Sequence, residues 1–222
     1  MNKKIILLVM LLCTICANAQ DDFGIWTSIG VEKKILPGLN AYAEGDFRLR
    51  DDAQTIDRWS GGIGLSYKIF SFLKISGDYN LIRFNHEKRD WETGHRFNLY
   101  ATGSYKWDNF TISLRERFQQ TYREGVSRTA KRANPKKILR SRLQVSYKIA
   151  DTKFKPFASV ELFHTLNDPQ SNGLDKTRYT VGTEYKINKK NAFEVYYRYQ
   201  ANNKDDSEQN RHILGVGYTF DF

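Results

Sequence analysis

The sequence predicts an all-β protein, an antiparallel up-and-down transmembrane β-barrel of about 10–12 strands. Three observations predict this fold class. Apolar and polar residues alternate along most of the chain, a short phrase containing tyrosine recurs, and the last residue, Phe222, is aromatic. Alternation with a period of two residues is typical of a strand with one apolar face and one polar face.

Residues 1–19 are predicted to be a secretory signal. Lys3 and Lys4 come first, an apolar run follows from residue 5 to residue 12, and Ala17-Asn18-Ala19 has the small-x-small pattern of a cleavage site. The apolar run is too short to cross a bilayer as a helix, which takes about 20 residues. We therefore expect cleavage after Ala19, and one outer-membrane barrel domain over residues 20–222.

The two cysteines, Cys13 and Cys16, both lie inside the predicted signal. The exported chain would then have no disulfide, no thiolate metal site and no cysteine nucleophile, so we expect no metal and no cofactor. The net charge of the whole chain is +10. Because export excludes nucleic acid, the expected partners of this charge are anionic lipopolysaccharide and small anionic solutes.

The alternation divides the chain into eleven strand-like windows. They cover residues 23–33, 40–50, 58–69, 73–81, 96–107, 110–119, 139–149, 158–162, 178–187, 193–200 and 214–222. In the sixth, for example, Phe110 and Ile112 alternate with Thr111 and Ser113. Single-chain bacterial barrels have even strand numbers, so we expect ten or twelve strands, with a bend or a lumenal segment within residues 20–33.

A recurring phrase marks the ends of alternate windows. Its tyrosines are Tyr67, Tyr105, Tyr147, Tyr185 and Tyr218, and a lysine follows each of the first four. Short linkers follow the phrases, and long polar linkers separate them, at residues 51–57, 85–94, 122–137, 166–175 and 202–210. Since outer-membrane barrels have short periplasmic turns and long extracellular loops, the phrases are predicted at the periplasmic rim. Their tyrosines would join an aromatic girdle, and their lysines would face the lumen.

The polar face carries many charges, with basic residues in excess. The lumen-lining residues that we expect are Arg48, Arg50, Lys68, Lys74, Arg96, Arg115, Arg117, Arg140, Arg142, Arg198, Glu44, Asp46, Glu184 and Glu194. Two interpretations stay open. Ion pairs could fill a closed structural barrel, or a narrow water-filled channel could prefer anions.

The C-terminal strand ends in a pattern that resembles the signature of substrates of the barrel assembly machinery. Tyr218, Phe220 and Phe222 would form this assembly signal. In addition, the basic linker 122–137 could bind lipid A phosphates through charge-assisted contacts.

Several segments resemble a family of bacterial outer-membrane barrels, domain of unknown function 2490, which is common in Bacteroidota. The resemblance is carried by residues 23–27 (FGIWT), by residues 44–50 (EGDFRLR) and by the Tyr-Lys-Ile strand ends. It covers most of the exported chain. It implies an outer-membrane location and a barrel fold, and it supplies no site residues.

Two further interpretations compete with a passive barrel. An outer-leaflet lipid hydrolase would need a hydroxyl, a base and an orienting acid. The candidates for these roles are His86, His95, His164, His212, Ser171, Ser207, Asp175 and Glu208, which no signature joins, so enzymatic activity is not the first expectation. The third interpretation is a soluble, secreted β-barrel that binds a ligand.

Overall fold

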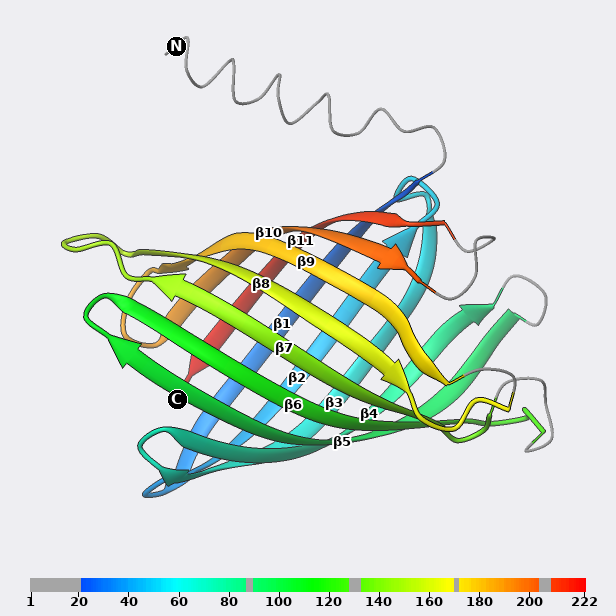
Figure 1. Cartoon of the computed structure of the whole chain (residues 1–222), viewed down its shortest axis with the longest axis horizontal. Coiled ribbons are helices and arrows are strands. Elements are labelled where there is room, and N and C mark those ends of the chain that lie inside the picture. Colours follow the sequence, from blue (N-terminus) through cyan, green and yellow to red (C-terminus); the bar gives the residue numbers. More distant parts are fainter. Residues whose placement is uncertain (1–20, 87–89, 128–132, 170–171, 204–208) are drawn as a thin grey trace, which may run out of the picture.

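The computed structural model describes residues 21–86, 90–127, 133–169, 172–203 and 209–222, which form a closed barrel (Figure 1). Its eleven strands are β1 (Asp22–Leu36), β2 (Leu39–Arg50), β3 (Thr55–Phe70), β4 (Leu73–His86), β5 (Asp90–Trp107), β6 (Phe110–Arg123), β7 (Lys136–Tyr147), β8 (Phe154–Thr165), β9 (Gly173–Lys186), β10 (Asn191–Asn202) and β11 (Arg211–Asp221). The all-β barrel predicted from the alternation is confirmed. The described residues contain no helix that is both long and apolar enough to cross a membrane.

Each strand is long enough to cross a membrane, and most strands are longer than a crossing requires. The strands run from 11 residues in β11 to 18 in β5, whereas a tilted crossing takes about 9–11 residues. β4 continues to His86 and β5 begins at Asp90, so both strands extend into the predicted linker 85–94. The sheet therefore projects beyond the membrane at the loop end.

The barrel closes through one parallel pair of strands. β1 pairs with β11 in parallel, from Asp22 opposite Arg211 to Glu32 opposite Asp221, and every other neighbouring pair is antiparallel. The expectation of ten or twelve strands is therefore wrong, because β1 enters from the same end as β11 and an odd number of strands closes the sheet. Closure leaves no unpaired edge, as a membrane requires.

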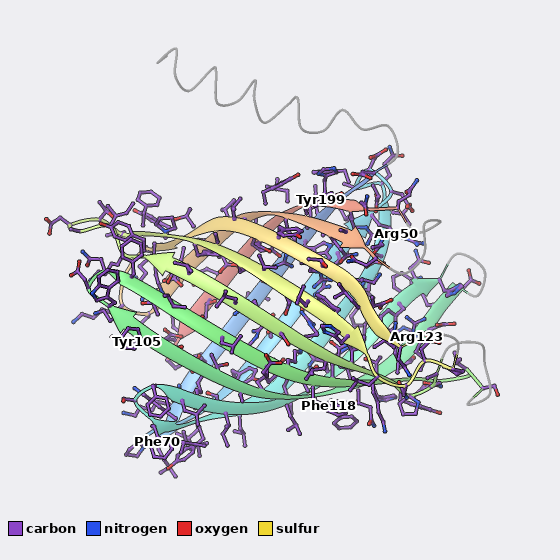
Figure 2. All side chains as sticks on the ribbon, in the orientation of Figure 1. Arg50, Phe70, Tyr105, Phe118, Arg123 and Tyr199 are labelled. Atoms are coloured by element: carbon purple, nitrogen blue, oxygen red, sulfur yellow. The ribbon has the colours of Figure 1, made fainter. Side chains whose placement is uncertain are left out.

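The two ends of the barrel differ in their connections. At one end lie the C-terminus and the connections after β1, β3, β5, β7 and β9, and the first three of these span two residues each (Figure 1). At the other end lie the three longest connections, after β6, β8 and β10, and two short ones, after β2 and β4, where strand residues take up part of the predicted linkers 51–57 and 85–94. Gly38 in the first turn has φ +82° and Asp108 in the third has φ +50°, which allow the chain to reverse over two residues. Phe70 and Tyr105 mark the turn end in Figure 2.

The outer face of the barrel is apolar and open to its surroundings. Ile63 is 67% exposed, Leu99 65% and Trp107 69%. Aromatic pairs surround the turn end, with ring centroids 4.7 Å apart in Phe110–Tyr147 and 4.9 Å apart in Phe193–Tyr218. Such a continuous apolar belt with an aromatic rim fits lipid and is unfavourable in water, so the structure does not favour a soluble binding protein.

Candidate functional site

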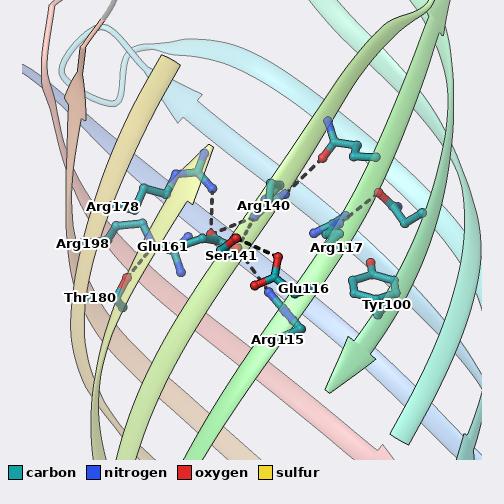
Figure 3. Close-up of polar contacts among 12 residues, drawn as sticks. Tyr100, Arg115, Glu116, Arg117, Arg140, Ser141, Glu161, Arg178, Thr180 and Arg198 are labelled. Carbon is teal, nitrogen blue, oxygen red and sulfur yellow. Dashed lines mark hydrogen bonds and ion pairs between the residues drawn. The ribbon is translucent and has the colours of Figure 1, made fainter. Parts of the chain in front are cut away.

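Charged side chains gather inside the barrel, around Glu161. The guanidinium of Arg140 donates from Nη2 to both carboxylate oxygens of Glu161, each at 2.9 Å. Arg115 Nη2 lies 3.4 Å from Oε1, and Arg178 Nη1 lies 3.8 Å from Oε2 (Figure 3). Glu161 is only 5% exposed. Three guanidinium groups thus share one buried carboxylate, and two positive charges remain in excess. Ion pairs of this kind hold side chains from four strands together.

Strand register explains how these residues meet. Arg115 on β6 is opposite Arg142 on β7, Arg142 is opposite Glu161 on β8, and Glu161 is opposite Arg178 on β9. Directly opposed residues on neighbouring strands share a face, so all four side chains enter the lumen at one level. Three of the four are basic.

Other arginines at nearby levels bond neutral partners. Nε of Arg117 donates to Asn98 Oδ1 at 3.0 Å, and Nε of Arg198 donates to Thr180 Oγ1 at 2.9 Å. Arg96 Nε bonds Thr121 Oγ1 in the same way, at 3.0 Å. A neutral acceptor positions a guanidinium without cancelling its charge, so this part of the lumen keeps excess positive charge. We call Arg115, Arg117, Arg140, Arg142, Arg178 and Arg198 the arginine layer.

Aromatic rings stack on this layer from within the lumen. Arg178 lies 4.4 Å from the ring centroid of Phe163 and 5.0 Å from that of Trp26. Cation–π contacts of this kind stabilise guanidinium groups in a confined space. The sequence interpretation missed these rings, because it assigned aromatic residues to the lipid side. The sequence did contain a signal for Trp26. It lies two residues from Gly24 and two from Ser28, so it shares their inward-facing side of β1.

The lumen is filled on the loop side and more open on the turn side. Its buried apolar side chains all lie in the loop-side half, and they include Trp26, Ile82, Phe163 and Ile213, which is 0% exposed. Towards the turn end, inward-facing lysines remain exposed. They are Lys68, Lys74, Lys106, Lys148 and Lys186. A basic vestibule on the turn side thus leads to the arginine layer.

The other charged residues expected in the lumen occupy inward-facing positions around this layer. Arg48 and Asp46 are neighbours on β2, with Arg48 Nη2 3.6 Å from Asp46 Oδ1, and Glu44, on the same face, is exposed. Arg50 lies at the loop end and contacts Asp51 at 3.5 Å. Glu184 and Glu194 are directly opposite each other on β9 and β10, at the turn side of Arg198.

One lumenal carboxylate sits apart from the arginines. Asp78 on β4 accepts a hydrogen bond from Tyr100 Oη at 2.6 Å and another from Tyr42 Oη at 3.1 Å. Asn80 and Asn98 donate to its other oxygen. Four neutral donors therefore hold Asp78 in place, and its carboxylate keeps its negative charge at a distance from Glu161.

Two histidines on the lipid side form matching chains of hydrogen bonds. His95 Nδ1 contacts Tyr79 Oη at 2.7 Å, and its Nε2 contacts Glu124 Oε1 at 2.7 Å. His212 likewise bonds Tyr197 and, at 3.1 Å, Asp21. Both imidazoles contact a phenol where a hydrolase would place an alcohol, so the geometry does not favour a lipid hydrolase.

The remaining hydrolase candidates give that activity no support. Asp175 pairs with Lys136, whose Nζ lies 3.1 Å from the carboxylate, rather than with a histidine. Ser171, Ser207 and Glu208 lie outside the described residues.

Comparison with known sequences identifies a family that covers most of the barrel. The sequence profile of a family described as "Protein of unknown function (DUF2490)" matches residues 23–211. No curated protein sequence matches the chain.

Solved outer-membrane barrels are similar in fold. The KdgM porin in complex with disordered oligogalacturonate has a TM-score of 0.50 at 16% identity, over 88% of this chain and 96% of that one. The beta domain of the Bordetella autotransporter BrkA has a TM-score of 0.50 at 11% identity, over 85% of this chain and 83% of that one. The NanC porin has a TM-score of 0.49 at 13% identity, over 81% and 86%. At such identities the likeness concerns the fold alone.

Proposed function

Because this chain belongs to the DUF2490 family and closes into a barrel of the outer-membrane kind, we propose that it is a narrow outer-membrane channel that prefers small anions. The observation that carries this proposal is the arginine layer, where three guanidinium groups share the single carboxylate of Glu161. Rings of arginine or lysine in a pore favour anions over cations.

The arginine layer concentrates positive charge at one level of the lumen (Figure 3). On its turn side lie the exposed lysines, and Glu184 and Glu194 lie between Lys186 and Arg198. Low-dielectric walls concentrate the field of such charges, so the local concentration of anions rises. Side chains pack closely around the layer, since Arg140 and the neighbouring Phe163 are only 8% and 6% exposed.

A planar bilayer experiment tests this function. With a salt gradient across the membrane, the sign of the reversal potential should report preference for chloride over potassium. Arg198→Gln should lower the anion-to-cation permeability ratio severalfold. Arg83→Gln is the matched control, because Arg83 faces away from the lumen and bonds Thr93 Oγ1. A cation preference in the unmodified protein would contradict the proposal.

A closed structural barrel is the second candidate, and the filled loop-side half of the lumen favours it. Trp26 is 3% exposed and Ile213 is fully buried, as in a packed core. Heat-modifiable migration on a detergent gel would show that the purified protein is a folded barrel. If such a protein does not conduct, the barrel is closed and its role is structural. Conductance that appears only after Trp26→Ala would identify the aromatic side chain as the barrier.

The cellular context of this channel is part of the proposal. We propose export through cleavage after Ala19, which lies outside the described residues, and assembly by the barrel assembly machinery through Tyr218, Phe220 and Phe222. Membrane lipid would then surround the apolar belt, and lipopolysaccharide would contact the loop end. Within the basic linker, Arg123 contacts Glu92 at 3.3 Å, and Arg128, Lys131 and Arg132 lie outside the described residues.

A further inference from the structure

Not every guanidinium of the arginine layer has its hydrogen bonds satisfied. Within the described part of the chain, the buried Nε atoms of Arg115, Arg140 and Arg142 have no hydrogen-bond partner. Arg140 as a whole is 8% exposed. Buried polar groups are nearly always paired in proteins, so this layer would gain from a further anion held close to its guanidinium groups.

A row of neutral hydrogen-bonding residues lies next to the layer on the vestibule side. Ser113 on β6 is opposite Gln144 on β7, Gln144 is opposite Ser159, and Ser159 is opposite Thr180. This row faces the lumen one step closer to the turn end than Arg115, Arg142, Glu161 and Arg178. Arg198 completes it, because Arg198 is opposite Thr180 on β10.

Positive charge exceeds negative charge around Arg142. Glu161, Arg140, Arg198 and Glu194 are the charged groups that act on it most strongly. Glu161 already bonds Arg140 and contacts Arg115 and Arg178. Glu194 is opposite Glu184 and Gly217, at the turn side of Arg198. The five guanidinium groups of this level therefore outnumber its three carboxylates: Arg115, Arg140, Arg142, Arg178 and Arg198 against Glu161, Glu184 and Glu194.

We propose that the lumen holds a binding site for a small oxyanion, phosphate or carboxylate, between the arginine layer and the Ser113–Gln144–Ser159 row. Arg115, Arg142 and Arg198 would supply the charge, and the hydroxyl and amide groups would supply further donors. Guanidinium forks match the paired oxygens of phosphate and carboxylate, whereas a halide offers no such pair. This inference rests on the proposed anion preference and narrows it from anions in general to oxyanions.

Calorimetric titration of the whole barrel in detergent tests the site without requiring conductance. Inorganic phosphate and acetate are added in separate titrations over a constant chloride background, and each should bind one site. The ratio of the two affinities shows whether the site prefers a phosphate or a carboxylate. Arg142→Gln should weaken binding at least tenfold. Arg142→Lys keeps the charge but loses the fork, so it should restore only part of the affinity. Arg83→Gln, on the outer face, should bind as the unmodified protein does.

The outcomes separate this inference from the proposed function. Oxyanion binding in a barrel that does not conduct would leave the site standing and overturn the channel. Anion-selective conductance in which phosphate neither binds nor slows the chloride current would overturn the site and leave the channel. Equal affinity in the unmodified protein and Arg142→Gln, with both showing heat-modifiable migration, would also overturn the site.

Discussion

At the scale of single residues, Gly215 shows how closely the lumen is packed. A Cβ atom on Gly215 would lie 2.0 Å from Cζ of Tyr196, whose ring covers this glycine from the neighbouring strand. We predict that Gly215→Ala lowers the free energy of unfolding by about 1–3 kcal/mol, the usual cost of overpacking. Urea unfolding in detergent micelles measures this. Gly103→Ala, whose nearest neighbour would be 4.0 Å away, is the control. An equal effect of both variants would contradict the packing argument.

Glu161 is the residue on which the arginine layer depends. Its removal leaves Arg140, Arg115 and Arg178 facing one another without a carboxylate between them. We predict that Glu161→Gln lowers the free energy of unfolding by about 3–5 kcal/mol, as breaking one side of a buried ion pair does. The same urea titration checks this.

Any Glu161→Gln protein that folds should prefer anions more strongly than the unmodified protein. Glu124→Gln, at the exposed loop end, is the matched control, and it should change neither stability nor selectivity appreciably. Unchanged stability in Glu161→Gln would show that the ion pairs contribute nothing net.

At the scale of strands, β6 carries an acidic residue on its otherwise largely apolar outer face. Glu116 lies midway along β6 between the inward-facing Arg115 and Arg117, so its side chain faces lipid. Ser141 on β7 donates a hydrogen bond to it at 2.7 Å. Carboxylates facing lipid near the midplane destabilise barrels, although less than the roughly 2–4 kcal/mol of arginine or lysine.

We therefore predict that Glu116→Leu raises the free energy of unfolding in phospholipid vesicles, by about 1 kcal/mol. Glu44→Leu is the comparison, because Glu44 faces the lumen and its loss should bring no such gain. A destabilised Glu116→Leu protein would show instead that the hydrogen bond from Ser141 outweighs the cost of the carboxylate in lipid.

At the scale of the whole molecule, the parallel pairing of β1 with β11 determines at which end of the barrel β1 begins. Asp21 contacts His212, and Asp22 N bonds Asn210 O at 2.9 Å, so the first described residues lie at the loop end. If the long loops are extracellular, as in other outer-membrane barrels, residue 21 is on the cell surface.

We predict that a membrane-impermeant maleimide labels Asp21→Cys on intact cells and leaves Asp108→Cys, in a turn at the opposite end, unlabelled. Both variants should be labelled after the cells are lysed. The reverse pattern on intact cells would mean that the barrel is inserted the other way round.

The sequence by itself determined the fold class, the lipid-facing belt and the two kinds of connection. These follow from local properties: a strand presents alternate residues to opposite faces, and tight turns need particular residues such as Gly38 and Asp108. The alternation therefore located all eleven strands, and it placed residues such as Arg140 and Arg142 on the polar face.

Only the tertiary structure decided how the barrel closes and which charges meet. The parallel pairing of β1 with β11 joins residues about 190 positions apart, and no local pattern encodes it. The meeting of Arg115, Arg142, Glu161 and Arg178 depends on the register of four strands, and a shift of one residue would turn each side chain to the other face. Trp26 and Phe163 have the residue types of a lipid-facing girdle, and although the alternation places them on the polar face, only the closed sheet brings them against Arg178.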